Sequence, residues 1–215
     1  MRCLIQSREL GTAGFVAEID SLCGVYATAM RADPAQLPGR RAIMERHAQQ
    51  AGFRAIAVTA PAACDSSIIA FGYGFSGAGG QWWHDIVRSA LTAKTGATVA
   101  SAWLDSSMEI AELHVHPDFQ RRGIGRSLLL GLTDGRSEHT TVLSTQDDNG
   151  PARRLYRSVG FADLLTGFSF PGGGPPYTIM AAVLPLLLAG RAGGASSRSR
   201  RRAVRQPLAD SPEIE

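Results

Sequence analysis

The segment 114–132, HVHPDFQRRGIGRSLLLGL, limits the possible folds of this chain more than any other. It passes from an apolar strand-like run that ends at Pro117, through a polar turn, into an apolar run with helical spacing. The turn contains residues 120–122, QRR, followed by Gly123 and Gly125. A strand that feeds a helix through such a turn sets a row of backbone N–H groups at the helix start, which predicts an anion site.

The residues of this turn suit a phosphate in particular. A phosphate must approach the main chain closely, which a Cβ atom obstructs, and a turn that requires positive φ also favours glycine. Arg121 and Arg122 add fixed positive charge for phosphate oxygens. The G-x-G-x-x-G fingerprint of dinucleotide-binding domains fits less well, because position 128 is Leu and the glycines follow QRR instead of a strand.

Charge is unevenly distributed along the 215 residues. The formal net charge is +3, yet residues 191–215 hold six Arg against three acidic residues, and residues 1–190 hold 16 basic and 16 acidic residues. The neutral part therefore predicts no nucleic-acid footprint of its own. We expect one domain over residues 1–190 and a disordered Arg-rich tail over residues 191–215, with weak nucleic-acid contact confined to that tail.

The cysteines and the apolar runs narrow the class of protein. Cys3, Cys23 and Cys64 form no CxxC pair and accompany no histidine cluster, which argues against a disulfide framework and against a metal site. The N-terminus lacks the apolar core of a signal peptide, and the most apolar C-terminal run is about half the length that a bilayer requires. We expect a cytoplasmic protein without a membrane segment or a metal, as a monomer or a homodimer.

The spacing of apolar residues predicts alternating helices and strands elsewhere. Residues 15–30 carry a stripe at spacings of three and four, which predicts a helix that buries Phe15, Ile19, Leu22, Tyr26 and Met30. Further helices are expected at 40–53, 126–136 and 149–161. Strands are expected at 54–60, 66–77, 108–117, 140–146, 164–170 and 176–184.

The segment 77–107 has a glycine-rich entry, two adjacent tryptophans and a short helical stretch. We expect a long loop here, which in a compact domain is usually functional or carries structure of its own. Trp82 and Trp83 have two interpretations: one ring fills the core while the other covers the loop, or both line a substrate pocket.

A second motif follows the phosphate turn and gives the first one a context. It reads N-x-x-A-x-x-L-Y-x-x-x-G-F from Asn149 to Phe161 and includes Ala152 and Tyr156. With both motifs in this order, the sequence resembles the GCN5-related N-acetyltransferase (GNAT) superfamily, specifically over 109–161 and more loosely over 15–185. The resemblance implies an α/β fold with a mixed, mostly antiparallel sheet, flanking helices and splayed central strands.

The resemblance also implies a co-substrate, acetyl-CoA, and the residues that bind it. The turn would hold the pyrophosphate through Gln120, Arg121, Arg122, Gly123, Ile124, Gly125 and Arg126. The pantetheine arm would lie along Leu113, His114 and Val115, with an amide near Val115 polarising the thioester. Asn149 and Tyr156 would face the thiol end, and Ala152 would also belong to the cofactor-binding residues.

The chemistry of acetyl transfer to an amine requires a base and benefits from an acid. A primary amine has a pKa of about 10 and must lose a proton before it attacks. Tyr156 fits the acid that protonates the leaving thiolate, although a tyrosine here can also be a plain core aromatic, and Asn149 can be only a helix cap. Since neither Cys23 nor Cys64 lies beside the motifs, we expect direct attack in a ternary complex without a covalent enzyme intermediate.

The base has two candidates, Glu112 and Glu109. They lie three residues apart, so they point to opposite faces of a strand unless a bulge intervenes. Glu112 is preferred because it lies nearer the expected thioester. His114 and His116 share its face and are either proton relays or exposed histidines. The alternative function is a CoA-binding sensor or interaction module without transfer activity.

Overall fold

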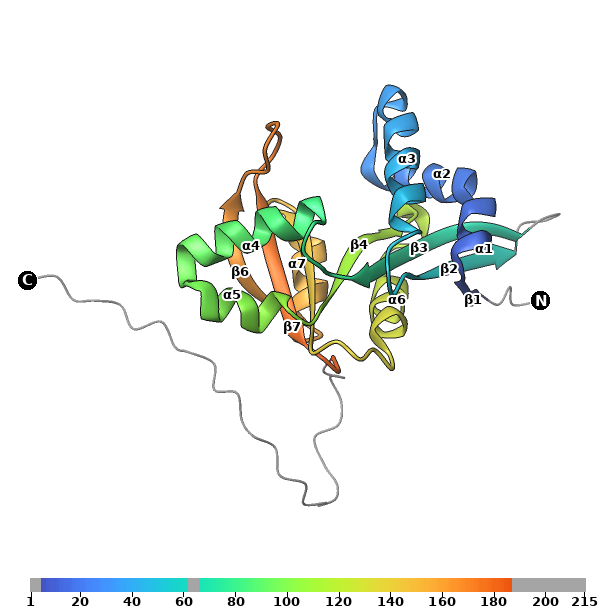
Figure 1. Ribbon diagram of the computed structural model, residues 1–215. Helices are drawn as coiled ribbons and strands as arrows, with labels where there is room; N and C mark the ends of the chain where they lie inside the picture. Colours follow the sequence, from blue (N-terminus) through green and yellow to red (C-terminus); the bar gives the residue numbers. More distant parts are fainter. Residues whose placement is uncertain (1–4, 62–65, 187–215) are drawn as a thin grey trace, which may run out of the picture.

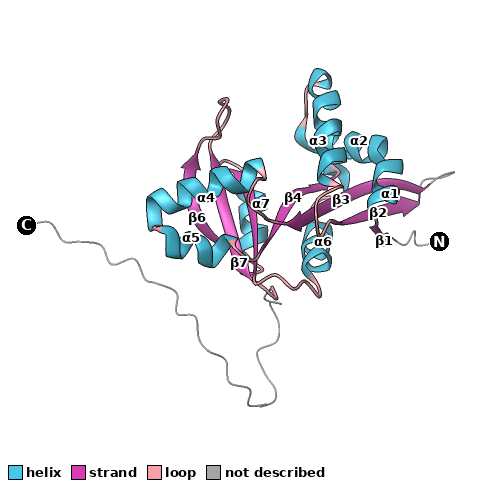
Figure 2. Ribbon diagram, in the orientation of Figure 1, coloured by secondary structure: helices cyan, strands magenta, loops and turns pink. Residues whose placement is uncertain are grey.

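The computed structural model describes residues 5–61 and 66–186, which fold around a seven-stranded sheet (Figures 1 and 2). The strand order is β1-β2-β3-β4-β5-β7-β6, and every neighbouring pair is antiparallel except β4 and β5. The predicted mixed, mostly antiparallel sheet is therefore confirmed. The strands are β1 (Gln6–Leu10), β2 (Arg54–Pro61), β3 (Ser66–Ser76), β4 (Ser107–Val115), β5 (Thr140–Gln146), β6 (Ala162–Phe168) and β7 (Tyr177–Val183).

Helices cover both faces of the sheet. Three of them, α1 to α3, bury apolar side chains against one face of β2 and β3, and α6 packs on the opposite face. At the other end of the sheet α4 and α5 cover one face of β5 to β7, and α7 covers the other (Figure 1). The helices are α1 (Thr12–Ala17), α2 (Ile19–Met30), α3 (Leu37–His47), α4 (Trp82–Thr95), α5 (Ala97–Leu104), α6 (Ile124–Thr133) and α7 (Gly150–Arg157), with short 3-10 turns η1 (Pro34–Gln36) and η2 (Pro117–Phe119).

The predicted helix over 15–30 is divided at Glu18 into α1 and α2. Its apolar stripe is buried as predicted at Phe15, Ile19, Leu22 and Tyr26. The prediction that Met30 is buried is wrong, because this residue is 42% exposed. It occupies the last turn of α2, immediately before a residue in the left-handed conformation that ends the helix.

The long loop expected over the segment 77–107 is wrong for most of its length, whereas the alternative that this segment carries structure of its own is confirmed. It forms α4 and α5, separated by Gly96 with a φ of +88°. Both helices are amphipathic, and their buried residues pack against the inner side chains of β5, β6 and β7. The buried apolar residues are Val87, Leu91, Ala100 and Leu104.

The expected tail over residues 191–215 lies outside the described residues, as do Cys3 and Cys64. Cys23 is described and is buried on α2, away from the cleft presented below. Within 5–61 and 66–186 no helix has both the length and the apolar character that crossing a membrane requires.

Candidate active site

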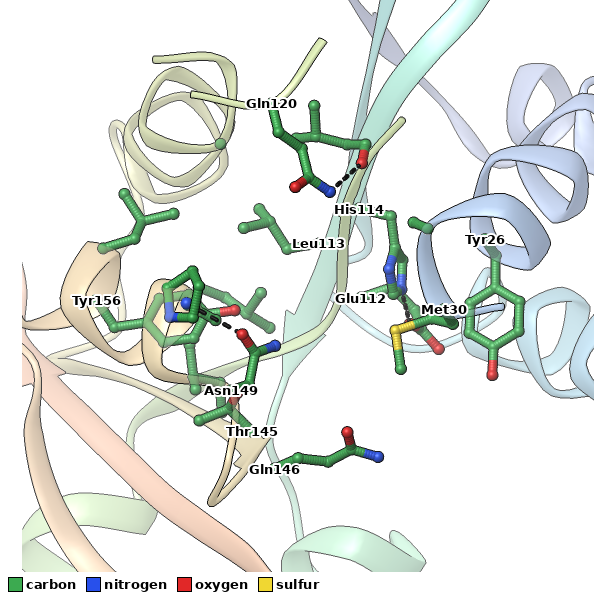
Figure 3. Close-up of a pocket in the computed structure, with 18 of the residues that line it drawn as sticks. Tyr26, Met30, Glu112, Leu113, His114, Gln120, Thr145, Gln146, Asn149 and Tyr156 are labelled. Carbon is green, nitrogen blue, oxygen red and sulfur yellow. Dashed lines mark hydrogen bonds and ion pairs between the residues drawn. The ribbon is translucent and has the colours of Figure 1, made fainter. Parts of the chain in front are cut away.

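A cleft of about 990 Å³ opens where β4 and β5 separate (Figure 3). The two strands pair only between Ser107–Glu109 and Thr140–Val142, so the predicted splay of the central strands is confirmed. The ends of α6 and α7 and the connection from α2 to α3 complete the walls. Most predicted site residues line it: Glu112, Leu113, His114, Val115, Gln120, Arg121, Gly123, Ile124, Gly125, Arg126, Asn149, Ala152 and Tyr156.

The turn before α6 has the geometry of an anion cradle. Gly123 caps the helix with a φ of +82°, and Arg121 also has a positive φ, +63°. The first intrahelical bond is donated by the amide of Ser127 to the carbonyl of Gly123, so the three amides before Ser127 have no helical acceptor. A Cβ on Gly125 would lie 3.1 Å from Leu155 Cδ2, so this glycine allows α6 to approach α7.

Only some of the nearby arginines reach the cleft. Arg121 and Arg126 line it. Arg122 does not: its guanidinium donates to the carbonyl of Asp118 at 3.0 Å and lies over the Phe119 ring. Its predicted phosphate contact therefore requires that these interactions break.

The exposed edge of β4 is suited to hydrogen-bonding an extended ligand. The His116 amide donates to the Ile69 carbonyl of β3 at 2.8 Å, so by strand alternation Leu113 and Val115 turn their amides and carbonyls toward the gap. The Gln120 side chain donates to the Val115 carbonyl at 3.0 Å and occupies one end of this edge.

Tyr156 and Asn149 have the structural roles predicted for them, a core aromatic and a helix cap, and both also line the cleft, where the acid role of Tyr156 and the thiol-end contact of Asn149 stay predictions. Tyr156 is a buried core aromatic that packs 5.7 Å from Phe161, and it also lines the cleft. Its burial, reinforced by the negative charge of Glu112, raises the pKa of Tyr156 to about 12. Asn149 caps α7 by accepting a bond from the Ala152 amide at 3.2 Å, and it too lines the cleft.

A bulge in β4 determines whether Glu109 and Glu112 point to the same face of the strand. Tyr73 pairs with Glu112 and Gly74 pairs with Ile110, so no β3 residue faces Ala111. Ile110 packs in the cluster beneath α6 and α7, whereas Ala111 packs with the α1 to α3 cluster, which is also the side of Glu112. Since Glu109 alternates with Ile110, the bulge brings Glu109 and Glu112 to the same face.

Glu112 is buried and both of its oxygens are occupied. Arg40 Nη1 donates to Oε1 at 2.7 Å, and Oε2 forms a short contact with His114 Nε2. Burial tends to raise the pKa of this carboxyl, but the neighbouring His114 and Arg40 outweigh burial and hold the pKa of Glu112 below its usual range. Glu112 is therefore an ionised, fully hydrogen-bonded carboxylate, which makes it a weak proton acceptor.

Glu109 has the opposite environment. Burial raises the pKa of Glu109 to about 8, and its Oε2 has no hydrogen-bond partner among the described residues. Its basicity suits a base, but it lies behind the lining of the cleft, so it would have to act through an intervening group.

The predicted substrate residues lie on α4, beside the cleft. Trp83 Nε1 is 3.3 Å from the Ser144 hydroxyl, which lines the cleft, whereas Trp82 is 60% exposed and stacks on Phe170. Neither ring is part of the cleft lining, and a contact with substrate stays a prediction. His116 is not part of the cleft lining and lines a separate hollow, so its position does not support its predicted part in a relay.

Arg40 was missed by sequence reasoning. It lies on α3, 72 residues before Glu112, and its guanidinium also covers the Tyr26 ring at 4.7 Å. An arginine on the polar side of a short helix carries no local signal of an ion pair with a distant strand. The proline-containing segment after Met30 interrupts the helical pattern of the sequence. This interruption was the available indication that the chain leaves the core there.

Comparisons with known proteins agree with this architecture. Residues 82–163 match the acetyltransferase (GNAT) domain family. Over 184 residues the chain is 35% identical to a GCN5-like protein acetyltransferase of Mycobacterium tuberculosis, covering 75% of this chain and 89% of that protein. A shorter match, 45% over 53 residues, links it to the N-alpha-acetyltransferase RimI of the same organism, covering 25% of this chain and 34% of RimI.

Solved structures share the fold at low sequence identity. The PaiA N-acetyltransferase of Thermoplasma acidophilum, in complex with coenzyme A, superimposes with a TM-score of 0.53 at 13% identity, over 84% of this chain and 99% of that one. The splayed sheet and the glycine turn define a GNAT fold. The chain belongs to the GNAT acetyltransferase family.

Proposed function

We propose that this protein transfers the acetyl group of acetyl-CoA to a primary amine of a polypeptide, by direct attack in a ternary complex. The observation that carries the proposal is the single cleft that joins the cradle of α6, the free edge of β4 and the Tyr156 hydroxyl. The relative with 35% identity is described as a protein acetyltransferase, which supports a polypeptide acceptor over a small amine.

The residues present fit acetyl-CoA. The free amides of α6, with Arg121 and Arg126 beside them, suit the phosphates, and the cradle stays open because Gly123 has no Cβ. The unpaired edge at Leu113 and Val115 suits amide groups of an extended arm. When bound, acetyl-CoA supplies an activated acyl group with a thiol as its leaving group.

The chain's own groups would manage protons and charge. A main-chain amide near Val115 would stabilise negative charge on the acyl oxygen, and the Tyr156 hydroxyl would donate to the departing sulfur. With a pKa of about 12, Tyr156 stays protonated throughout the working range and can keep this donor role. Two glutamates are candidates for the base that takes the proton of the amine: Glu112 is ionised but hydrogen-bonded through both oxygens, and Glu109 has a raised pKa but lies behind the cleft lining.

The proposal is tested by mixing the protein with acetyl-CoA and a panel of acceptors while free thiol is followed. The panel contains a lysine peptide, a peptide with a free N-terminus, an N-acetylated peptide without lysine as control, and small primary amines. Thiol release above hydrolysis with an unblocked peptide supports the proposal. Binding of acetyl-CoA without release for any acceptor supports the alternative, a catalytically silent CoA-binding module.

Three expectations extend this proposal to the whole protein. We propose that residues 1–190 act as one catalytic domain, that residues 191–215 contribute no catalytic group, and that the protein works in the cytoplasm. A truncated protein, residues 1–190, is expected to retain kcat and KM for a peptide acceptor.

A further inference from the structure

We infer that His114, held by Glu112 and Arg40, is the catalytic base that takes the proton from the acceptor amine. The inference rests on the proposed function and names the base that the proposal leaves between two glutamates. It follows from four observations on one wall of the cleft: the tautomer that Glu112 selects, the anchoring by Arg40, the packing of the imidazole, and its position at the cleft surface.

The Glu112 carboxylate fixes which nitrogen of His114 carries the proton. Oε2 of Glu112 contacts Nε2 of His114, and an ionised carboxylate can only accept a hydrogen bond. Nε2 must therefore carry hydrogen, which leaves Nδ1 with its lone pair in the neutral ring. No hydrogen bond to this Nδ1 is found within the described residues, so the lone pair is free to accept a proton.

Arg40 keeps Glu112 ionised and immobile. Its guanidinium donates to Oε1 at 2.7 Å, on the oxygen that His114 does not use. Helix α3 thereby ties β4 to the α2 side of the cleft, and the same guanidinium rests on the Tyr26 ring. The order Arg40, Glu112, His114 matches the logic in which an oriented carboxylate holds an imidazole in a productive tautomer and stabilises its protonated form.

Aromatic rings hold the imidazole in place. Tyr26 of α2 packs against it edge-on with centroids 5.1 Å apart, and Phe71 of β3 lies at 5.4 Å. The groups that face the ring are thus Glu112 from its own strand, the Tyr26 phenol from α2 and, through the carboxylate, Arg40 from α3. His114 is only 9% exposed, yet it lines the cleft. A base in this position is fixed in orientation and shielded from bulk water.

The opposite wall carries the groups proposed for the thiol end. Figure 3 shows Asn149 and Tyr156 across the cleft from Glu112 and His114. An acceptor that enters between α2 and β5 therefore has a proton acceptor on one side and a proton donor on the other. Glu112 cannot fill the first role itself, since both of its oxygens already accept hydrogen bonds.

The proton balance of the step closes. The neutral amine nitrogen forms the new C–N bond while the C–S bond breaks and its electron pair leaves with sulfur. One N–H proton moves to Nδ1 of His114, and sulfur takes a proton from the Tyr156 hydroxyl. His114 then returns its proton to solvent and Tyr156 recovers one, so neither residue is changed after one turnover.

The first test compares His114→Gln with a matched control, His116→Gln, two residues along the chain and outside the cleft. We expect His114→Gln to lower kcat/KM for a peptide acceptor by about 10²- to 10⁴-fold, the range of general base catalysis, with an unchanged Kd for acetyl-CoA. His116→Gln should keep wild-type kinetics. Added imidazole should restore part of the activity of His114→Gly.

The possible outcomes distinguish a failure of the proposed function from a failure of the inference about His114. If wild-type protein acetylates no acceptor, the proposed function fails. If wild-type protein is active and a folded His114→Gln variant keeps its kcat/KM, the inference about His114 is wrong and the base lies elsewhere. An equal loss in His114→Gln and His116→Gln would also overturn it, because the effect would then be structural.

A second test needs no activity and no variant of His114. The ¹⁵N chemical shifts of the imidazole nitrogens in the wild-type protein report which one is protonated. We expect Nε2 protonated and Nδ1 unprotonated in the neutral ring, and this preference should weaken in Glu112→Gln. A ring protonated at Nδ1 would contradict the inference even if a His114 variant failed to fold.

The positioning residues are tested through a split of kinetic constants. Arg40→Met should lower kcat with little change in KM for acetyl-CoA, because Glu112 loses its anchor, and Arg40→Lys should recover part of the loss by restoring a donor to Oε1. A purely structural Arg40 would predict similar kcat values for both variants once folding is matched, and that result would remove Arg40 from the arrangement.

Discussion

Gly123 stands at the start of α6 in a conformation that side chains rarely adopt, with open space where a Cβ would extend. Gly135, just beyond the end of the same helix, also has a positive φ and open space around it, but it lies outside the cleft. Substitution of either glycine should therefore cost about 1 kcal/mol of backbone strain, but only Gly123 lies where a ligand in the cleft would contact it.

We predict that Gly123→Ala weakens acetyl-CoA binding by about tenfold or more, equivalent to about 1.4 kcal/mol. The methyl group would enter the cradle and disturb the amides that we propose bind the phosphates. Isothermal titration calorimetry measures the change, with Gly135→Ala as the control that should bind normally. Equal affinities for the two variants would show that the cradle does not hold the phosphates.

Tyr156 allows a second prediction at the residue scale. Tyr156→Phe removes one hydroxyl and keeps the ring packed against Phe161, so stability should change little. Loss of the donor to the departing sulfur should lower kcat by about 10²-fold, with an unchanged Kd for acetyl-CoA. Stopped-flow measurement of thiol release gives the rate. An unchanged kcat would remove Tyr156 from the acid role.

Glu109 gives a pH-dependent prediction. Its folded-state pKa is about 8, above the value of about 4.3 expected in the unfolded chain. A group whose pKa is raised by folding contributes stability below the unfolded value and loses it as pH rises through the folded value. The wild-type protein should therefore lose up to about 5 kcal/mol from this group between pH 4.5 and pH 9.

Glu109→Gln should lack this loss and gain stability over the wild type as pH rises, which urea denaturation at pH 5 and pH 9 can measure. Glu9→Gln, at an exposed carboxylate of β1, is the control and should follow the wild type at both pH values. If the stabilities of Glu109→Gln and the wild type change in parallel with pH, burial does not oppose the ionisation of Glu109.

The glutamates also show where sequence reasoning reaches its limit at this scale. The residue types of the cradle and of the second motif could be interpreted because each motif is local. The relative facing of Glu109 and Glu112 depended on a bulge at Ala111, and a bulge depends on how β3 and β4 align, which neither strand's sequence reveals alone. The ion pair between Arg40 and Glu112 could not be predicted either, because it depends on how α3 and β4 lie in the fold.

At the scale of elements, strands and helices with a strong period were predicted well, and the segment between β3 and β4 was not. The glycines at 77, 79 and 80 indicated a loop, but they occupy only the approach to α4. The helices themselves are stabilised by packing on β5 to β7, a tertiary contact that outweighs local composition. The same packing fixes where the two tryptophans lie.

Helix α4 places Trp82 at one end of a row of aromatic rings. Trp82 stacks on Phe170 at 5.6 Å, and Phe170 meets Tyr177, a residue of the cleft lining, at 5.3 Å. If a polypeptide acceptor extends along this row, Trp82→Ala should raise its KM about fivefold, or about 1 kcal/mol, and leave the KM of a small amine unchanged. Val16→Ala, at an exposed apolar residue of α1, is the control, and equal KM values for Trp82→Ala and wild type would exclude the row as a docking path.

At the scale of the whole molecule, the two ends of the sheet have separate cores that one cluster connects. The α1 to α3 cluster and the α4 to α5 cluster share no residue, whereas the cluster beneath α6 and α7 draws on both halves. Met108, Leu129, Leu143 and Tyr156 all belong to it. The cleft thus opens above a continuous core, which favours unfolding of both halves in one transition.

Each half contains a histidine whose partial or full burial disfavours protonation of its ring. His47 lies at the end of α3, where burial lowers the pKa of its imidazole to about 4, and burial, with Arg88 nearby, lowers the pKa of His84 on α4. Both rings are neutral when folded, and neither ring nitrogen of His84 has a partner among the described residues. The stability that these groups contribute is present above the unfolded value of about 6.5 and is lost as pH falls below it.

We therefore predict that protonation of the two histidines lowers the melting temperature between pH 6.5 and pH 4, partly offset by the opposite contribution of Glu109, in a single transition for both halves. His84→Leu should reduce this fall and also raise stability at pH 7 by about 1 kcal/mol, since it removes two buried nitrogens without partners. His139→Gln, at an exposed histidine, is the control and should keep the wild-type slope. Calorimetry at four pH values tests both predictions. Two separate transitions would show that the shared core does not couple the halves. An unaltered slope of melting temperature against pH in His84→Leu would exclude His84 as a source of acid sensitivity.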